Sequence, residues 1–228
     1  MKLAIIGIGA IGAAIVWAPM ARAAEDDWYV SAFGGGMLME DSQNLGNSNP
    51  LNFDSSYKVG YAARAAIGAY RVPQVRTEVE FGYRTVKFDK LSFANDGGLG
   101  ATAGGTSLSG LSASASGRFT AISGMLNAYY DYDTGTAWRP YIDAGFGTAW
   151  LDAHGVAAAG VSVVSATDLV FAYQFGFGIG YDVTKAITLA LDYRYFTTLD
   201  PTFKDAAGAS FNSEFTSHAV SLGVRYRF

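Results

Sequence analysis

The chain has 228 residues, of which 50% are hydrophobic, and it contains 28 glycines and no cysteine. The absence of cysteine excludes a disulfide framework and any thiolate metal or redox site. A formal net charge of −4 leaves no excess of basic residues of the kind that a nucleic-acid-binding protein carries.

Residues 1–23 are predicted to form a cleavable secretory signal peptide. Lys2 provides a positive start, the stretch from Leu3 to Met20 is almost wholly apolar, and Ala21-Arg22-Ala23 is a small-x-small cleavage site. A membrane-anchor helix is the alternative, but glycines and a proline interrupt the stretch and the cleavage site follows directly. The mature region, residues 24–228, is expected to form one domain with a net charge of 14 − 20 = −6.

The mature region contains eight segments in which apolar and polar residues alternate. Such alternation predicts strands with one apolar and one polar face. The expected strands are about Trp28–Leu38, Tyr57–Tyr70, Val75–Phe88, Phe119–Tyr132, Trp138–Leu151, Leu169–Tyr181, Ala186–Phe196 and Glu214–Phe228. Three glycines blur the alternation of the first strand, so its two faces stay unassigned.

The connections between these segments alternate between short and long. The short ones are R-V-P-Q, T-G-T-A and D-V-T-K, which are typical of tight turns. The long ones cover about Met39–Ser56, Asp89–Arg118, Asp152–Asp168 and Thr197–Ser213. Within the second, the low-complexity stretch from Leu91 to Gly117 is expected to be a mobile loop. This wiring predicts an all-β fold, an eight-stranded antiparallel up-and-down barrel with its short turns at one end.

The size of the apolar side chains indicates which way the barrel faces. In the sixth and seventh strands one face is nearly all Phe, Tyr, Leu and Ile, too bulky to fit inside an eight-stranded barrel. A soluble lipocalin-like barrel would need that face inside, whereas a transmembrane barrel exposes it to lipid. The sequence therefore predicts a transmembrane β-barrel with a crowded polar lumen.

Aromatic residues near the strand ends are expected to form girdles at the two membrane interfaces. The girdle at the short turns is predicted to contain Tyr130, Tyr132, Trp138, Tyr181, Tyr226 and Phe228. The opposite girdle is predicted to contain Tyr57, Tyr83 and Trp150.

The faces expected to point into the lumen carry charged residues: Arg64, Glu78, Glu80, Arg84, Asp143, Asp192, Arg194, Arg225 and Arg227. One interpretation is a proton or ion path. The other is a structural network of opposite charges that plugs the barrel, because unpaired buried charge is very costly. We favour the structural network, since side chains fill the interior of an eight-stranded barrel. Glu80 is expected to pair with Arg64 and to lie near Arg84.

The sequence contains no pattern that predicts catalysis or a cofactor. The two histidines, His154 in an expected loop and His218 on the lipid-facing side of the last strand, are not grouped with serine and carboxylate. There is no phosphate-binding loop and no metal-ligand spacing, and G-F-G-I-G at Gly176–Gly180 has the period of a strand. We therefore expect no enzyme activity, no cofactor and no metal.

Four stretches resemble the opacity-protein and surface-antigen family of eight-stranded outer-membrane barrels, to which OmpA-like and Ail-like small barrels are related. They are W-Y-V-S-A-F-G-G-G after the signal, Y-I-D-A-G-F-G-T-A-W in the fifth strand, F-A-Y-Q-F-G-F-G-I-G-Y-D-V-T-K-A-I-T-L-A-L-D-Y-R-Y-F through the sixth and seventh, and V-R-Y-R-F in the last. The last strand of such barrels carries the signal that the barrel-assembly machinery reads. The resemblance thus implies an assembly signal made of Val220, Leu222, Val224, Tyr226 and Phe228.

The same resemblance implies a location in the bacterial outer membrane, with its lipids and the assembly machinery as partners. It implies a structural, surface-exposed barrel that supports the cell envelope or acts as a surface antigen or adhesin, with host surface or matrix proteins bound through the long loops. It brings no catalytic residues, and the charge count already argues against a nucleic-acid partner. The alternative function is a narrow porin-like channel for small or hydrophobic solutes, and a lipid-modifying enzyme would need the missing triad.

Overall fold

The computed structural model of the protein describes residues 28–46, 52–95, 107–158, 161–199, 202–204, 210–212 and 215–228. The predicted signal peptide, residues 1–23, lies outside these ranges and stays a prediction. Within them, no helix is long and apolar enough to cross a membrane.

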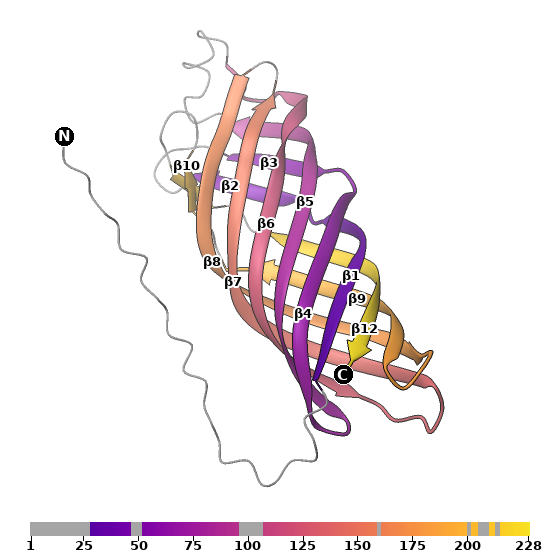
Figure 1. Ribbon diagram of the computed structural model, residues 1–228. Coiled ribbons are helices and arrows are strands. Elements are labelled where there is room, and N and C mark those ends of the chain that lie inside the picture. Colours follow the sequence, from indigo (N-terminus) through magenta and orange to yellow (C-terminus); the bar gives the residue numbers. More distant parts are fainter. Residues whose placement is uncertain are drawn as a thin grey trace, which may run out of the picture.

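Eight long strands close into a ring (Figure 1). They are β1 (Trp28–Met39), β4 (Gly60–Val72), β5 (Val75–Asn95), β6 (Ser112–Asp131), β7 (Trp138–Ala158), β8 (Val161–Asp182), β9 (Ile187–Thr198) and β12 (Thr216–Arg227). Each strand pairs antiparallel with the next one in the chain, and β12 pairs with β1 to close the barrel. The predicted eight-stranded antiparallel up-and-down barrel is confirmed.

The two ends of the barrel differ in their connections. At the turn end, Pro73 and Gln74 join β4 to β5, residues 132–137 join β6 to β7, and residues 183–186 join β8 to β9. The last residue lies there too, since the backbone N–H of Phe228 donates to the carbonyl of Trp28 at 2.9 Å. The opposite end carries four short strands, which we call the crown: β2 (Ser42–Gly46), β3 (Asn52–Tyr57), β10 (Thr202–Lys204) and β11 (Ser210–Asn212). The crown strands pair in the order β10-β11-β2-β3 and join the barrel through β5 (Figure 1).

The strands at the crown end are longer than the sequence pattern indicated. β5 continues to Asn95 and β6 begins at Ser112. β7 continues to Ala158 and β8 begins at Val161. The prediction that Asp89–Arg118 and Asp152–Asp168 are loops is therefore wrong for the described residues, and His154 lies in β7. In β6 the residues S-A-S-A-S, from Ser112 to Ser116, alternate with a period of two, as a strand requires. Their small side chains concealed that pattern.

The outer wall of the barrel is apolar, as a surface solvated by lipid requires. Phenylalanine, leucine, isoleucine, valine and tyrosine side chains stand outward on all eight long strands. β1 follows the same rule, with Trp28, Val30 and Leu38 outward and with Tyr29 and Met37 buried inside. Val220, Leu222, Val224 and Tyr226 of β12, and Phe228 directly after it, are all exposed on this wall. Their role as an assembly signal stays a prediction.

Aromatic residues stand outward at both ends of the apolar wall. At the turn end, Tyr130, Tyr132, Trp138, Tyr181, Tyr226 and Phe228 are all exposed. At the other end, Tyr83 and Trp150 are exposed outward. The prediction that Tyr57 belongs to this girdle is wrong, because the residue lies in the crown strand β3. The centroid of its ring is 5.0 Å from that of the buried Phe88.

Phe175 provides a test of the lipid-facing wall. It lies in the middle of the apolar stretch of β8, opposite Ala144 and Tyr195, and is 54% exposed. The substitution Phe175→Arg is expected to lower the free energy of unfolding by about 2–4 kcal/mol, the cost of a charge at the bilayer midplane. Urea unfolding in lipid vesicles measures this loss, with Phe175→Leu as the matched control. An unchanged midpoint for the arginine variant would show that this face does not contact lipid.

Candidate functional site

The half of the lumen near the turn end contains a layer of ionised side chains, which we call the ionic layer. Its members balance in charge, with five arginines and five carboxylates: Arg64, Arg76, Arg84, Arg194, Arg225, Glu78, Glu80, Asp131, Asp143 and Asp192. All ten side chains are buried. Because charges removed from water are costly unless they are paired, an equal number of each sign is the arrangement that a closed lumen needs.

Glu80 lies at the centre of the ionic layer. Its Oε2 atom is 3.1 Å from Arg194 Nη1 and 3.5 Å from Arg64 Nε. Asn127 donates to the same oxygen at 3.2 Å, and Gln174 donates to Oε1 at 3.2 Å. The two arginines also reach other carboxylates, since Arg64 Nη2 lies 2.8 Å from Asp192 Oδ1 and Arg194 Nη2 lies 3.3 Å from Asp143 Oδ1. Glu80 thus joins two guanidinium groups that come from β4 and β9, strands that β1 and β12 separate in the ring.

A second part of the ionic layer lies nearer the turn end. Arg76 Nε is 3.1 Å from Asp131 Oδ2, and Arg225 Nη1 is 3.7 Å from the same oxygen. Tyr129 connects the two parts, because its hydroxyl donates to Glu78 and accepts from Arg194 Nη2 at 3.0 Å. Because Glu78 Oε2 also lies 3.6 Å from Arg76 Nη1, the ionic layer is one continuous network.

Inward-facing glycines provide the space that the large side chains of this layer occupy. A Cβ atom on Gly178 would lie 2.5 Å from the Tyr141 ring, and one on Gly176 would lie 2.3 Å from an oxygen of Asp143. Both side chains belong to β7 and lie over the neighbouring strand β8. This explains why the G-F-G-I-G segment has glycine at alternate positions: they leave room for the ionic layer.

The structure brings together most of the predicted lumen residues. Arg64, Glu78, Glu80, Arg84, Asp143, Asp192, Arg194 and Arg225 lie in the ionic layer, while Arg227 sits at the turn end and donates to the Tyr70 hydroxyl at 3.3 Å. The expected closeness of Arg84 to Glu80 is not seen as an ion pair. Instead Arg84 donates to Ser123 and Gln174 and lies 3.8 Å from the Phe196 ring centroid.

Sequence reasoning missed several members of the network. Arg76 and Asp131 stand on the polar faces of their strands, so the strand pattern itself could have identified them. Tyr29, Tyr129 and Tyr141 were hidden because an aromatic residue on an inward position looks like ordinary apolar cover.

The half of the lumen near the crown is apolar, which corrects the prediction of a polar lumen throughout. We call this cluster the apolar layer; its buried members are Met37, Met39, Phe53, Val86, Phe88, Leu91, Phe93, Leu108, Phe119, Ala121, Met125, Ala149, Leu151, Ala153, Val156, Ala158, Ala172, Phe196, Phe215 and Ala219. Phe119 is central to it, with its ring centroid 6.3 Å from that of Phe88 and 5.1 Å from that of Phe215. The crown residue Phe53 belongs to the same cluster, so the crown closes this end of the barrel.

The two layers together fill the lumen. Gln174, Leu151 and Phe215 are 0% exposed, and Glu80 and Arg194 are 1% exposed. In an open pore, water would reach the lining side chains, so such values indicate a closed interior. The cavity beside Arg76, Tyr129 and Tyr141 has a volume of only about 10 Å³, roughly the space of one water molecule.

The histidines lie outside the lumen. His218 hydrogen-bonds through Nδ1 to the Tyr193 hydroxyl at 2.7 Å and through Nε2 to Glu40 at 2.6 Å. His154 is exposed on β7. Among the described residues, no group of three His, Cys, Asp or Glu side chains could hold a metal ion.

Comparisons with known proteins agree with this architecture. A family model described as "Surface antigen" matches residues 34–223. The chain is 36% identical to the outer membrane protein PagN of Salmonella typhimurium over 75 residues, which cover 31% of each protein. It is 29% identical to outer membrane protein P.IIC of Neisseria gonorrhoeae over 145 residues, 49% of this chain and 48% of that protein. The chain thus spans less than half of the length of either relative.

A candidate adhesin of Rickettsia conorii is 24% identical over 186 residues, 77% of this chain and 70% of that protein. Two solved structures share the fold. Neisserial surface protein A aligns with a TM-score of 0.51 and 19% identity over 88% of this chain and 97% of that one. The outer membrane protein OprG of Pseudomonas aeruginosa aligns with a TM-score of 0.59 and 10% identity over 90% and 97%.

Proposed function

The chain belongs to the surface antigen family, and from this premise we propose that it binds molecules outside the cell through its crown and the crown ends of β5–β8, while its lumen serves only to hold the barrel together. The predicted family and the predicted location in the bacterial outer membrane are confirmed. The predicted role of a surface-exposed barrel is confirmed as well. The turn end then faces the periplasm and the crown end faces the outside, as in other outer-membrane barrels.

The closed lumen is the observation that carries this proposal. With Glu80, Gln174 and Leu151 out of reach of water, neither layer offers a path for solutes. The channel alternative has less support for the same reason. The long strands at the crown end, in contrast, extend past the apolar wall and build a platform that a partner could contact. The candidate adhesin among the relatives supports host surface or matrix proteins as partners of this platform.

The proposal includes the absence of catalysis. In the described part of the chain, Ser116 and Asp152 line the same groove as His154, but no hydrogen bond joins the three into a triad. His218 is hydrogen-bonded to Tyr193 and Glu40 and to no serine, and the surface antigen family supports a binding role. Outer-membrane lipids and the barrel-assembly machinery would be the remaining partners, since both are needed by any barrel of this kind.

Shortening the crown-end hairpins tests the proposal. In one variant the β5–β6 hairpin is cut back to Leu91 and Ala113, and in another the β7–β8 hairpin is cut back to Val156 and Val164, each closed by Asn-Gly. Bacteria that produce the full chain are expected to bind an immobilised host matrix protein or an epithelial surface. Both variants are expected to lose this binding although the barrel still folds.

The matched control replaces residues 133–137 of the β6–β7 turn at the opposite end by another turn of equal length. Folding of each variant is checked by its altered gel mobility before and after heating. Equal binding by the full chain, the control and both shortened variants would refute a role for the crown end, as would binding by none of them.

A further inference from the structure

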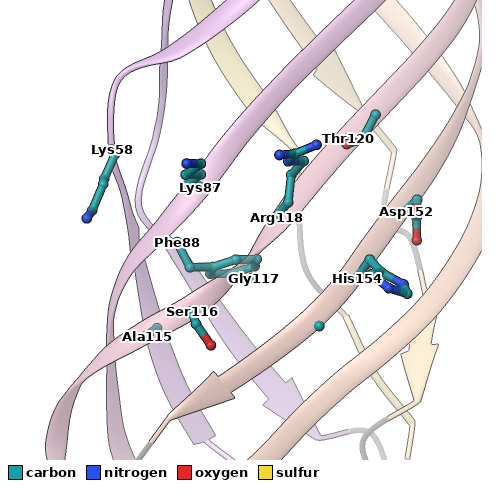
Figure 2. Close-up of a pocket in the computed structure, with 11 residues that line it drawn as sticks. Lys58, Lys87, Phe88, Ala115, Ser116, Gly117, Arg118, Thr120, Asp152 and His154 are labelled. Atoms are coloured by element: carbon teal, nitrogen blue, oxygen red, sulfur yellow. The ribbon is translucent and has the colours of Figure 1, made fainter.

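A row of basic side chains crosses three neighbouring strands on the outside of the barrel. Lys87 of β5 pairs directly with Arg118 of β6, and Arg118 pairs directly with His154 of β7. All three side chains are exposed, and Figure 2 shows them side by side on adjacent strands. Lys58 extends the row, because its backbone N–H donates to the carbonyl of Lys87 at 3.0 Å. The chain as a whole has a net charge of −4, so this row is a local exception.

The two central residues of the row, Lys87 and Arg118, form no ion pair in the described part of the chain. Lys58 is in an exposed ion pair with Asp89 at 3.7 Å, whereas Lys87 and Arg118 are in none. Asp152 stands one row nearer the apolar wall, opposite Thr120. Like charges placed directly opposite each other on neighbouring strands are destabilising. An anion between Lys87 and Arg118 would remove that repulsion.

The row lies just beyond the aromatic girdle, on the side of the crown. Tyr83, Ile122 and Trp150 pair across the same three strands and form the last apolar row before the crown. The basic row follows four residues further along each strand, about 13 Å along the strand and about 10 Å in height for tilted strands. Because aromatic girdles sit at the membrane interface, long basic side chains at this height can reach back to the headgroups of the outer leaflet.

The backbone around the row is shaped into a groove. The strand registers shift between Lys87 and Lys90, between Ser116 and Arg118, and between Ala153 and Val156, so a bulge stands beside each basic residue. Gly117 and Gly155 have φ angles of 111° and 64°, which disfavour other residues. A Cβ atom on Gly117 would lie 2.7 Å from the backbone of Val156, so the strands approach closely there. The resulting groove has a volume of about 620 Å³, and the four basic side chains line it together with the carboxylate of Asp152 (Figure 2).

We propose that this groove binds the phosphate of a phosphorylated lipid in the outer leaflet. The guanidinium of Arg118 and the ammonium groups of Lys87 and Lys58 would donate charge-assisted hydrogen bonds to the phosphate oxygens. His154 would add a further donor, and the apolar wall below the groove would contact the acyl chains. The site goes beyond the crown function proposed above, because it lies where the crown ends of β5, β6 and β7 leave the apolar wall and it takes a membrane lipid instead of a partner outside the cell.

The test measures the unfolding midpoint of the purified, refolded full chain in phosphatidylcholine vesicles with and without phosphorylated lipid A. Lipid A is expected to raise the midpoint of the wild type, and lipid A stripped of its phosphates is expected to leave it unchanged. The double variant Lys87→Gln/Arg118→Gln is expected to bind lipid A at least about tenfold more weakly, since even one lost charge-assisted hydrogen bond accounts for that factor. The matched control is Arg71→Gln/Lys185→Gln, which removes two exposed positive charges at the turn end and should leave the rise intact.

Three outcomes would overturn the proposal. An equal rise with dephosphorylated lipid A would show that the phosphate is not recognised. An equal loss in the control variant would show that only net charge matters. If the double variant lost binding of a sulfated heparin fragment but kept the response to lipid A, the groove would be a site for a soluble glycan and not for a lipid.

Discussion

Replacing Glu80 with alanine is expected to lower the free energy of unfolding by about 3–5 kcal/mol, because it leaves buried positive charge without its partner. Glu80 is 1% exposed and lies within 3.5 Å of both Arg64 and Arg194. After its removal those two arginines share only Asp143 and Asp192, so the balance of charge in the ionic layer is broken. Urea unfolding of the refolded protein in lipid vesicles measures the loss.

Two further variants test whether the loss comes from the charge of Glu80, from the size of its side chain or from its buried position. Glu80→Gln keeps the size of the side chain but can accept from only one of Asn127 and Gln174, so a loss similar to that of the alanine variant would assign the effect to the carboxylate and not to the size of the side chain. Asp89→Ala removes a carboxylate from an exposed pair with Lys58 and is expected to cost at most about 1 kcal/mol. In a double-mutant cycle, Glu80→Ala and Arg194→Ala should be non-additive because the residues are in contact. Strict additivity would contradict the ionic layer as described.

Truncation of Phe119 is expected to have an effect of similar size in the other half of the lumen. Phe119 is 1% exposed and packs against Phe88 and Phe215 at the centre of the apolar layer. Phe119→Ala should lower the free energy of unfolding by about 3–5 kcal/mol, from lost burial and from the cavity that remains. The same unfolding experiment measures it.

The control for this variant is Phe119→Leu, which leaves a smaller cavity and should cost clearly less. Because the ionic layer remains below it, Phe119→Ala should not make the barrel permeable to ions. A stable alanine variant would contradict the apolar layer, and an ion-permeable one would contradict the view that the ionic layer closes the lumen by itself.

The fold could be predicted because alternation with a period of two is a local property of each strand. It holds for β8, where Phe175 and Phe177 face outward and Gly176 and Gly178 face inward. It failed where side chains are small, as in Ser112–Ser116, whose alternation of serine and alanine resembles a low-complexity loop. There, pairing with β5 and β7 maintains the strand.

The lumen was harder to predict, because its packing depends on the register around the whole ring. The inward face of β5 changes from Glu80 and Arg84 to Val86 and Phe88, so the sequence did contain a sign of the apolar layer. The contact of Phe119 with Phe215, in contrast, joins residues far apart in the chain and follows only from the closed barrel. Arg84 shows the same limit: it lies on the expected face, yet Ser123 and Gln174 bind it, and not Glu80.

The conductance of the refolded wild-type protein in planar lipid bilayers tests the central claim, that the lumen is closed and the protein acts through its outer surface. The predicted result is the absence of stepwise conductance at protein concentrations at which a porin control inserts readily. Steady single-channel steps that increase in size in Glu80→Ala or Phe119→Ala would contradict the claim, because they would place an open path through both layers.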